Sequence, residues 1–436
     1  MASRSVRRND SSAAAGPPRP SARLWSVAAG GAAAVTVAGV IVSLATGSPS
    51  APSASAASAA RPTLRASAER GQTVSGVPVG YPHTQDGAKA AAANYTVVSG
   101  SADFLANPYD RDRAVSAMAA QGTADAAEKK ADLSAAQAIG ALQGDNPTFS
   151  VEQAIARTGV LSARVLGYDD RGAMVRLWTT TVRGSAAGHA TPSVGYQSVT
   201  VTLVWESNDW KLRDSSTTSG LFAPIDVRQA SNVPGDFVNY VPAAAGDPVV
   251  TGATGQGGFP APYERSEQGA RAAAVSAVML YGDPRFFTDA DWRHRMLAAT
   301  AAPSVLASVT SDADSTARLV SANRGVGTDG KTADGSELIT RTAALAARTI
   351  SCSDQAASIE LWTASVGGVA GKDETQRPQI AFLRMTVDLA WVDGTWKTTA
   401  VTPSGPLVPS PPVMQEADSA DSFADVGGAS NAPATA

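Results

Sequence analysis

One stretch of this chain occurs twice, and this internal repeat limits the folds that the chain can adopt. The segment YPHTQDGAKAAA begins at Tyr81, and the similar segment YERSEQGARAAA begins at Tyr263, 182 positions later. The same spacing continues without a gap to Arg111 and Arg293. A repeat that covers so much of the chain is a domain rather than the short unit of a solenoid. The sequence therefore predicts two copies of one domain.

Six tryptophans mark the later part of both copies. Trp178 is matched by Trp362 at a spacing of 184 positions, and the hairpins VWESNDWK and AWVDGTWK are matched at 186. We therefore place the domains at 77–224 and 259–407, joined by a Pro-, Gly- and Ala-rich linker at 225–258. The tryptophans are expected to pack within the sheets, the alternative being exposed aromatic contacts. These repeat markers are Trp178, Trp205, Trp210, Trp362, Trp391 and Trp396.

Each copy begins with helical periodicity and ends with strand periodicity. Thr84 and Ser266 are good N-caps, and alanines then recur at helical spacing. Alternating apolar residues and short polar turns follow, such as Asp393-Gly394 in the last turn of the second copy. The expected fold class is α+β, with two tandem domains in which helices pack on an antiparallel sheet.

A charge-free apolar segment of 22 residues runs from Leu24 to Ala45. As a helix it would reach about 33 Å, which is enough to cross a bilayer. Residues 1–23 carry five arginines and one acid, so the positive-inside rule predicts a basic cytoplasmic tail, a single-pass cell-membrane anchor and an extracytoplasmic bulk. The alternative is a cleaved signal peptide with SASAA at 53–57 as its processing site.

Two further segments have compositions that cannot bury a core. Residues 46–76 are rich in alanine, serine and proline, and residues 408–436 carry proline, serine, alanine and a few acids. They are expected to be a disordered linker and a disordered tail.

Composition argues against several kinds of site. Cys352 is the only cysteine, and the histidines His83, His189 and His294 are far apart in sequence. An intramolecular disulfide is therefore excluded, and no metal site is expected. The net charge of −4 gives no basic field for nucleic acid, and there is no P-loop motif. We expect neither a cofactor nor direct nucleic-acid binding.

Candidate acids and bases on the strands do not recur between the copies. Asp388 and Glu360 stand where the first copy has Thr202 and Arg176. By strand alternation Asp388 also shares a face with Thr386 and Ala390, so both carboxylates are expected to face solvent. General acid–base catalysis needs such a group inside a pocket, so no catalytic residue is assigned and the chain is not expected to be an enzyme.

A pair of arginines does recur on a predicted helix. Arg111 and Arg113 in the first copy match Arg293 and Arg295 in the second. They are expected to form a solvated face or an ion pair, the alternative being a contact with phosphate or a partner. Cys352 is expected to be a small buried hydrophobe on a strand.

This combination resembles the VirB8 and TcpC group of conjugation and type IV secretion proteins. The matching features are an N-in anchor, a tether, and two helix-first units that end in W-x4-W-K. The segment GVPVGYPHTQDGAKAAA at 76–92 is also similar to actinomycete membrane proteins associated with conjugal transfer. The resemblance implies tandem NTF2-like (cone-shaped) domains with curved sheets and no catalytic residues.

What the resemblance implies about function is a bitopic scaffold of a translocation complex. Such a protein acts by forming a homo-oligomer and by contacting other membrane and channel subunits. The alternatives are an accessory protein of another transport system, similar to Mce-associated proteins, or a ligand-binding cell-surface protein.

Overall fold

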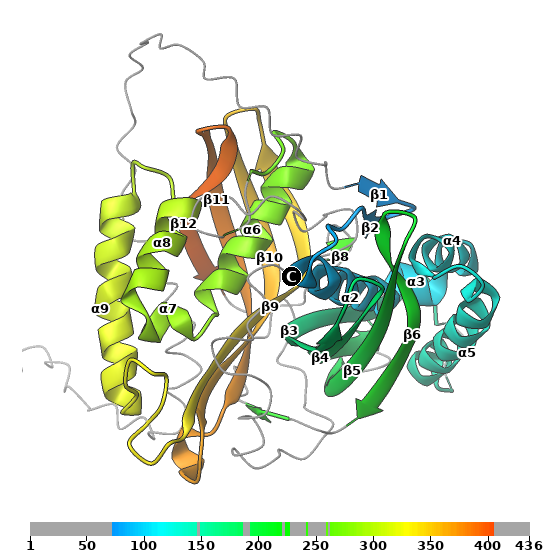
Figure 1. Ribbon diagram of the computed structural model, residues 1–436, viewed down its shortest axis with the longest axis horizontal. Coiled ribbons are helices and arrows are strands. Elements are labelled where there is room, and N and C mark those ends of the chain that lie inside the picture. Colours follow the sequence, from blue (N-terminus) through cyan, green and yellow to red (C-terminus); the bar gives the residue numbers. More distant parts are fainter. Residues whose placement is uncertain are drawn as a thin grey trace, which may run out of the picture.

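The computed structural model describes residues 72–145, 149–185, 192–219, 223–226, 241–242, 259 and 262–404. Within them the chain forms two α+β units, which we call unit 1 (72–219) and unit 2 (262–404) (Figure 1). The predicted anchor at 24–45 and the predicted tail at 408–436 lie outside the described residues. Among the helices of the described part, none has the length and apolar character needed to cross a membrane.

Unit 1 places its helices before its main sheet. A small antiparallel ribbon precedes the helices, and the sheet order is β3-β4-β5-β6, antiparallel throughout. The elements are β1 (Gln72–Val74), β2 (Val77–Val79), α2 (Gln85–Ser99), α3 (Ala102–Ala106), α4 (Pro108–Met118), α5 (Ala124–Gln143), η1 (Val151–Gln153), β3 (Ala154–Tyr168), β4 (Gly172–Ser185), β5 (Ser193–Glu206) and β6 (Asp209–Ser219).

Unit 2 repeats this order of helices and strands. Its elements are α6 (Glu267–Tyr281), α7 (Arg285–Thr288), α8 (Ala290–Thr300), α9 (Leu306–Arg324), β9 (Glu337–Cys352), β10 (Ala356–Ala370), η3 (Glu374–Gln376), β11 (Gln379–Val392) and β12 (Thr395–Ser404). Two short strands from between the units join its sheet: β7 (Ile225–Asp226) pairs with β11, and β8 (Val241–Pro242) pairs with β9. The prediction of a mixed α+β fold with antiparallel sheets is confirmed.

The first helix of unit 1 begins where the repeat begins. The Thr84 hydroxyl accepts a hydrogen bond from the Gly87 N–H at 3.0 Å, which caps α2. A Cβ on Gly87 would lie 2.1 Å from the carbonyl oxygen of Pro82. That same oxygen accepts a hydrogen bond from the Trp210 Nε1–H at 2.9 Å. The closing hairpin is thus fixed to the start of the helix.

Unit 2 has the same arrangement at its own first helix. Ser266 caps α6 by accepting from the Gly269 N–H at 3.0 Å, and a Cβ on Gly269 would lie 2.1 Å from the Glu264 carbonyl oxygen. The Trp396 Nε1–H donates to that oxygen at 2.8 Å. In both copies, the second tryptophan of the hairpin therefore fixes the hairpin to the start of the first helix.

We expect Gly87→Ala to lower the free energy of unfolding by about 1–3 kcal/mol, because the added methyl group must displace a backbone carbonyl. Gly140→Ala is the matched control, since Gly140 lies in the exposed part of a helix and its added Cβ meets nothing within 4 Å. This control should gain about 0.5–1 kcal/mol from helix propensity. Urea denaturation of the full chain measures both, and equal effects at the two glycines would contradict the packing argument.

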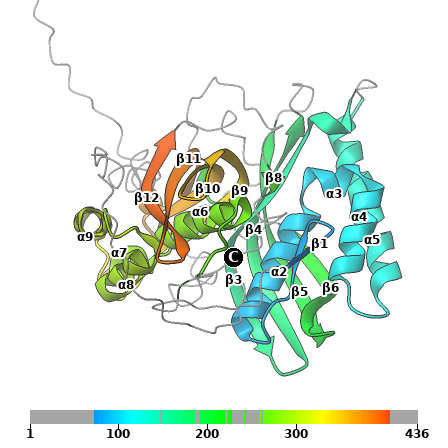
Figure 2. The ribbon, with the colours of Figure 1, turned by 90° about the horizontal axis from the view of Figure 1, so that it is seen from above.

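The two sheets pack against each other through the faces opposite their helices (Figure 2). Along β5, Val199 and Val201 belong to the core under the helices, whereas Val194 and Tyr196 point to the other face and join a cluster shared with unit 2. This cluster contains the same positions from both units: Ile155/Ile339, Leu161/Leu345, Trp178/Trp362, Val182/Val366, Val194/Ile380 and Tyr196/Phe382.

The contact between the units is that of an internal dimer. A Cβ on Gly159 would lie 2.9 Å from the Ala343 Cβ, and Ala343 is the counterpart of Gly159 at the 184-residue spacing. Equivalent residues meet in this way when two copies are related by an approximate two-fold axis. Helices α5 and α9 consequently lie on opposite outer sides of the molecule (Figure 1).

Candidate functional site

The helix-covered face of the unit 1 sheet encloses a hollow between α2 and strands β4, β5 and β6. Its volume is about 150 Å³, and we call it the polar hollow. Besides Gln197 and Arg183, hydroxyl groups dominate its lining: Ser99, Thr158, Thr179, Thr181, Ser215 and Thr217. The residues on β4 and β5 alternate with those of the inter-unit cluster, so they point to the helices rather than to unit 2.

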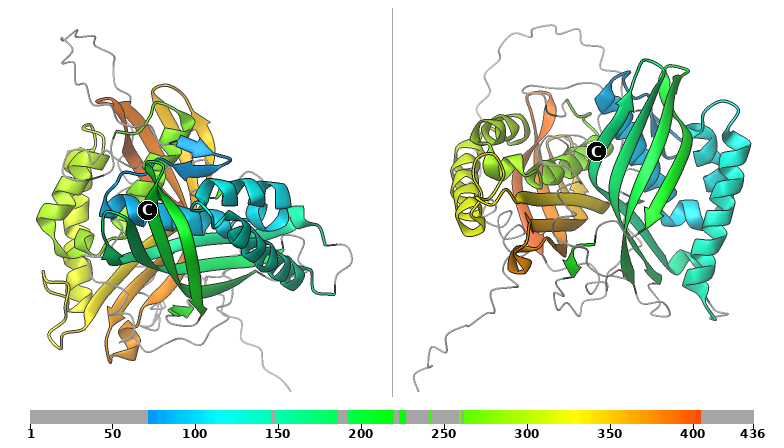
Figure 3. Two further views of the ribbon diagram at one scale, coloured as in Figure 1. Left: turned by 45° about the vertical axis from the view of Figure 1, so that its right-hand side comes forward. Right: turned by 60° about the horizontal axis from the view of Figure 1, so that its bottom comes forward.

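A second hollow of about 380 Å³ adjoins the first, and we call it the apolar hollow. It lies between helices α3, α4 and α5 and strand β6, where α4 and α5 stand beside the sheet (Figure 3). Apolar side chains form much of its wall, including Phe104, Leu105, Val115 and Met118. The two hollows share the residues Ser99, Arg183, Leu212 and Ser215. Arg183 therefore lies where the polar and apolar spaces meet.

Arg183 carries the charge of this site. Burial lowers the pKa of its guanidinium, yet an arginine remains protonated at neutral pH. Within the parts of the chain that the structure describes, no carboxylate forms an ion pair with it. The rim charges Lys130 and Asp214 neutralise each other at 3.1 Å, and the Lys130 ammonium also donates to the Ser215 carbonyl. The space where the two hollows meet is therefore cationic.

Unit 2 fills the corresponding space with larger apolar side chains. Arg183 is replaced by Gly367. The larger side chains are all buried in unit 2. With the unit 1 residue first, the pairs are Ser99/Tyr281, Gln197/Leu383, Val199/Met385, Leu105/Phe287, Val115/Leu297 and Ala127/Val309.

One of these differences moves a tyrosine by a single helical turn. In unit 1, Tyr95 is buried in the middle of the first helix and its hydroxyl donates to the Trp210 carbonyl at 2.7 Å. Its counterpart is Ala277, and unit 2 instead carries Tyr281 four residues later, at the position of Ser99. Burial raises the pKa of both tyrosines. The shift leaves the end of the helix open in unit 1 and closed in unit 2.

The predicted solvent exposure of Glu360 is wrong. Its side chain is buried and forms an ion pair with Arg348 at 2.6 Å, with Arg384 at 3.9 Å on its other side. The two arginines come from the neighbouring strands, which sequence spacing alone does not bring together. Asp388 is partly buried and accepts a hydrogen bond from the Ser358 hydroxyl at 2.7 Å. Neither carboxylate lines the hollows of unit 1.

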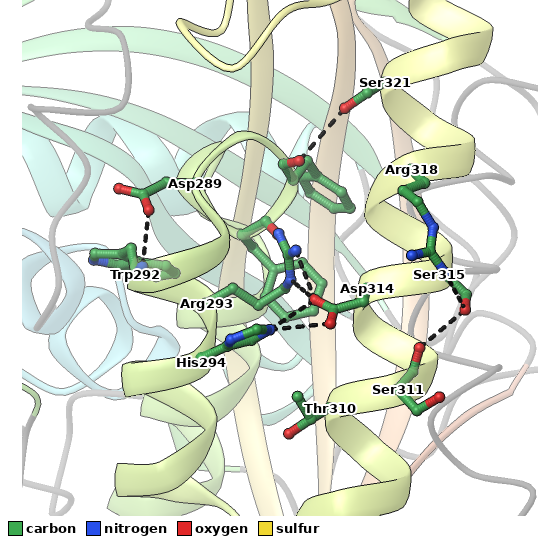
Figure 4. A network of polar contacts seen from close by, with 12 residues as sticks. Asp289, Trp292, Arg293, His294, Thr310, Ser311, Asp314, Ser315, Arg318 and Ser321 are labelled. Carbon is green, nitrogen blue, oxygen red and sulfur yellow. Dashed lines mark hydrogen bonds and ion pairs between the residues drawn. The ribbon is translucent and has the colours of Figure 1, made fainter.

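The recurring arginines divide into a buried and an exposed pair. Arg111 and Arg293 are buried and form ion pairs at 2.7 Å with an aspartate on the following long helix, whereas Arg113 and Arg295 are exposed. Figure 4 shows the unit 2 network, in which the carboxylate also meets His294.

The other sequence candidates lie away from the hollows. Cys352 is exposed, so its predicted burial is wrong, because it is the last residue of β9 and lies beyond the packed core. The His83 ring stacks on Trp205 at 4.1 Å between ring centroids. His189 lies outside the described residues. Within the described part of the chain, no group of three or more histidine, cysteine or acidic side chains could hold a metal ion.

Sequence reasoning missed Arg183 because one copy alone does not distinguish it from other strand residues. The available signal was the alternation Thr179, Thr181, Arg183 on one face of a strand, set against Gly367 at the matching position of the second copy. A charged residue on the helix-covered face of a sheet points into a core or a cavity.

Comparison with known proteins gives a family model over unit 1 and a solved structure. No curated protein matches the chain. A solved structure titled "Ntf2 like protein involved in plasmid conjugation" is 9% identical, covers 73% of this chain and 95% of its own, and has a TM-score of 0.18. A TM-score of this size does not establish a shared fold. Residues 67–235, which include all of unit 1, match the family model described as "Domain of unknown function (DUF8175)".

Proposed function

We propose that this protein is a non-catalytic assembly component of a conjugal-transfer complex of the type IV secretion kind. Its two units would be NTF2-like domains, held outside the cell membrane by the segment 24–45. The observation that carries the proposal is the packing of the units through their sheets. This packing makes one platform whose helices α5 and α9 lie on opposite outer sides and are available to partner subunits (Figure 1).

The chemistry of the candidate site supports binding rather than a reaction. Hydroxyls, an amide and a guanidinium recognise a ligand by hydrogen bonds and charge. Catalysis of proton transfer uses a group whose pKa lies near the working pH. The carboxylate at the rim, Asp214, is instead paired with Lys130, and the hydrogen bond from that lysine holds the pKa of Asp214 below its usual range.

Deletion of the gene tests the proposed role. Transfer of the cognate mobile element is expected to fall to background while growth stays normal, because a scaffold is needed for assembly but not for metabolism. Complementation with the full chain should restore transfer, whereas a chain that lacks residues 1–45 should not. Undiminished transfer after deletion would contradict the assembly role, and full rescue by the shortened chain would contradict the anchor.

A ligand-binding protein of the cell surface is the second candidate. One specific observation favours it, namely the open space in unit 1, where unit 2 carries larger buried side chains at the matching positions. A role as an accessory protein of another transport system is compatible with the same hollows. The deletion experiment separates the assembly role from both alternatives, since only the assembly role predicts a loss of conjugal transfer.

A further inference from the structure

We propose that unit 1, and not unit 2, binds a small amphipathic oxyanion, with the anionic head on Arg183 and the apolar body in the apolar hollow. The head is a carboxylate or a phosphate monoester, since both present oxygen pairs that suit a guanidinium. This proposal concerns binding by the purified protein, so it stands or falls independently of the assembly role.

The first argument is that the fold does not require the open space. Both units have the same order of elements and the same contacts at the first helix, yet unit 2 closes this region with buried tyrosine, leucine and methionine side chains. Larger side chains at these positions bury more apolar surface and so stabilise the folded state. The smaller side chains of unit 1 forgo that stabilisation, which favours an occupant for the space they leave.

The second argument concerns the head group. Arg183 is partly buried beside hydroxyl-bearing residues of β4 and β6, and within the described residues its guanidinium has no acidic partner. A partly desolvated cation without a counter-ion favours an anionic ligand strongly, because both gain more from pairing there than in water. Ser215 lines the polar hollow with it, and its hydroxyl can donate a further hydrogen bond to the same oxyanion.

The third argument concerns the apolar body. The apolar hollow exposes mostly carbon surface from α3, α4 and α5, including Leu105, Val115 and Met118. Its volume of about 380 Å³ falls in the range of roughly 300–1,000 Å³ that small-molecule sites occupy. A purely inorganic anion would leave this surface unfilled, so the ligand must carry a hydrocarbon part.

Isothermal titration calorimetry of the full chain with octanoate, octyl phosphate and octan-1-ol tests the proposal. At least one of the two anions should bind, and the alcohol should bind at least tenfold more weakly, because it cannot pair with the guanidinium. The tighter of the two anions identifies the head group. Absence of binding by both anions at millimolar concentration would overturn the proposal, as would equal affinity for the alcohol.

Two arginines on opposite faces of β4 supply a matched pair of variants. Arg183→Met should weaken binding of the preferred anion by about ten- to a hundredfold, since a charge-assisted hydrogen bond is lost. Arg176→Met removes the same charge from an exposed position on the other face of the strand, away from the hollows, and should leave the affinity unchanged. An equal loss in both variants would show non-specific attraction and would overturn the assignment to Arg183.

A third variant tests whether the ligand needs the open space of the two hollows, rather than the charge of Arg183. Ser99→Tyr introduces the residue that unit 2 carries at this position, and it should abolish binding by filling the hollow. Circular dichroism establishes whether this variant is folded. A folded Ser99→Tyr protein with unchanged affinity would overturn the location of the site, and the arginine variants decide the matter if this variant does not fold.

Discussion

Trp362→Ala is expected to lower the free energy of unfolding by about 3–5 kcal/mol, the usual cost of deleting a large buried aromatic side chain. Trp362 is fully buried in the cluster that joins the two units. Guanidinium denaturation of the full chain measures the loss. Tyr109→Ala is the control, because that ring is 66% exposed and its removal should change stability little.

The same substitution should also loosen unit 1, because the cluster belongs to both units. Hydrogen exchange at the backbone amides of β4 and β5 is expected to accelerate in Trp362→Ala, although the changed residue lies on β10. Trp178→Ala should act in the same way on β10 and β11. The two substitutions should not be additive, since they affect one cluster. Unchanged exchange in the partner unit would contradict mutual stabilisation.

Much of the fold could be predicted from local patterns in the sequence. N-caps such as Thr84 and Ser266, and the turn at Asp393-Gly394, determine the chain conformation within a few residues of themselves. The duplication added long-range information, because the pattern of one copy supports that of the other. The matched tryptophans Trp210 and Trp396 occupy equivalent positions for a physical reason, namely the hydrogen bond that each donates to a backbone carbonyl three residues before the first helix of its unit.

The pairing of the units could not be predicted in the same way. A strand that is buried on both faces loses the alternation that identifies its solvent side. Trp178 and Trp362 each lie on a sheet face that the other unit covers. The hydrophobic pattern of a single unit does not show that a second sheet packs on this face. Glu360 was assigned to solvent because the first copy has Arg176 at that position, and its partners Arg348 and Arg384 on adjacent strands could not be foreseen from sequence spacing.

The candidate site escaped sequence reasoning because an open space leaves no motif. It became visible only when side-chain sizes were compared between the copies at positions that the structure places in one region. Ser99 opposite Tyr281 and Gln197 opposite Leu383 are ordinary differences in an alignment. The structure brings Ser99, Gln197 and Arg183 together in the lining of the polar hollow.

Asp314→Ala is expected to destabilise the protein by about 3 kcal/mol, because it leaves a buried guanidinium without its counter-ion. The Arg293 Nη2 lies 2.7 Å from the carboxylate, and its Nη1 donates to the Phe286 carbonyl at 2.7 Å, so the arginine joins α7, α8 and α9 (Figure 4). Thermal denaturation of the full chain measures the effect. Asp312→Ala, on the same helix but outside this network, is the control and should cost much less.

The pH dependence follows from the pKa of Asp314. Burial raises that pKa, but hydrogen bonds from Arg293 and His294 outweigh burial and hold it below its usual range. A carboxyl group with a depressed folded-state pKa stabilises the fold above its unfolded value of about 3.9, and this contribution is lost as the pH falls further. The stability difference between wild type and Asp314→Ala should therefore shrink below about pH 4. A difference that persists unchanged at pH 3 would contradict the ion-pair explanation.

Asp132→Ala repeats this test in unit 1, where the consequence extends to the candidate site. Asp132 pairs with the buried Arg111 at 2.7 Å, and it lies on α5, the helix that forms one wall of the apolar hollow. The substitution should destabilise the protein as its counterpart does, and it should also weaken binding of the amphipathic anion because the wall is no longer held to α4. Asp314→Ala should leave that binding unchanged, since Asp314 belongs to unit 2 and lies outside the residues that line the two hollows of unit 1. Equal affinity of Asp132→Ala and Asp314→Ala for the anion would mean that the position of α5 does not shape the site.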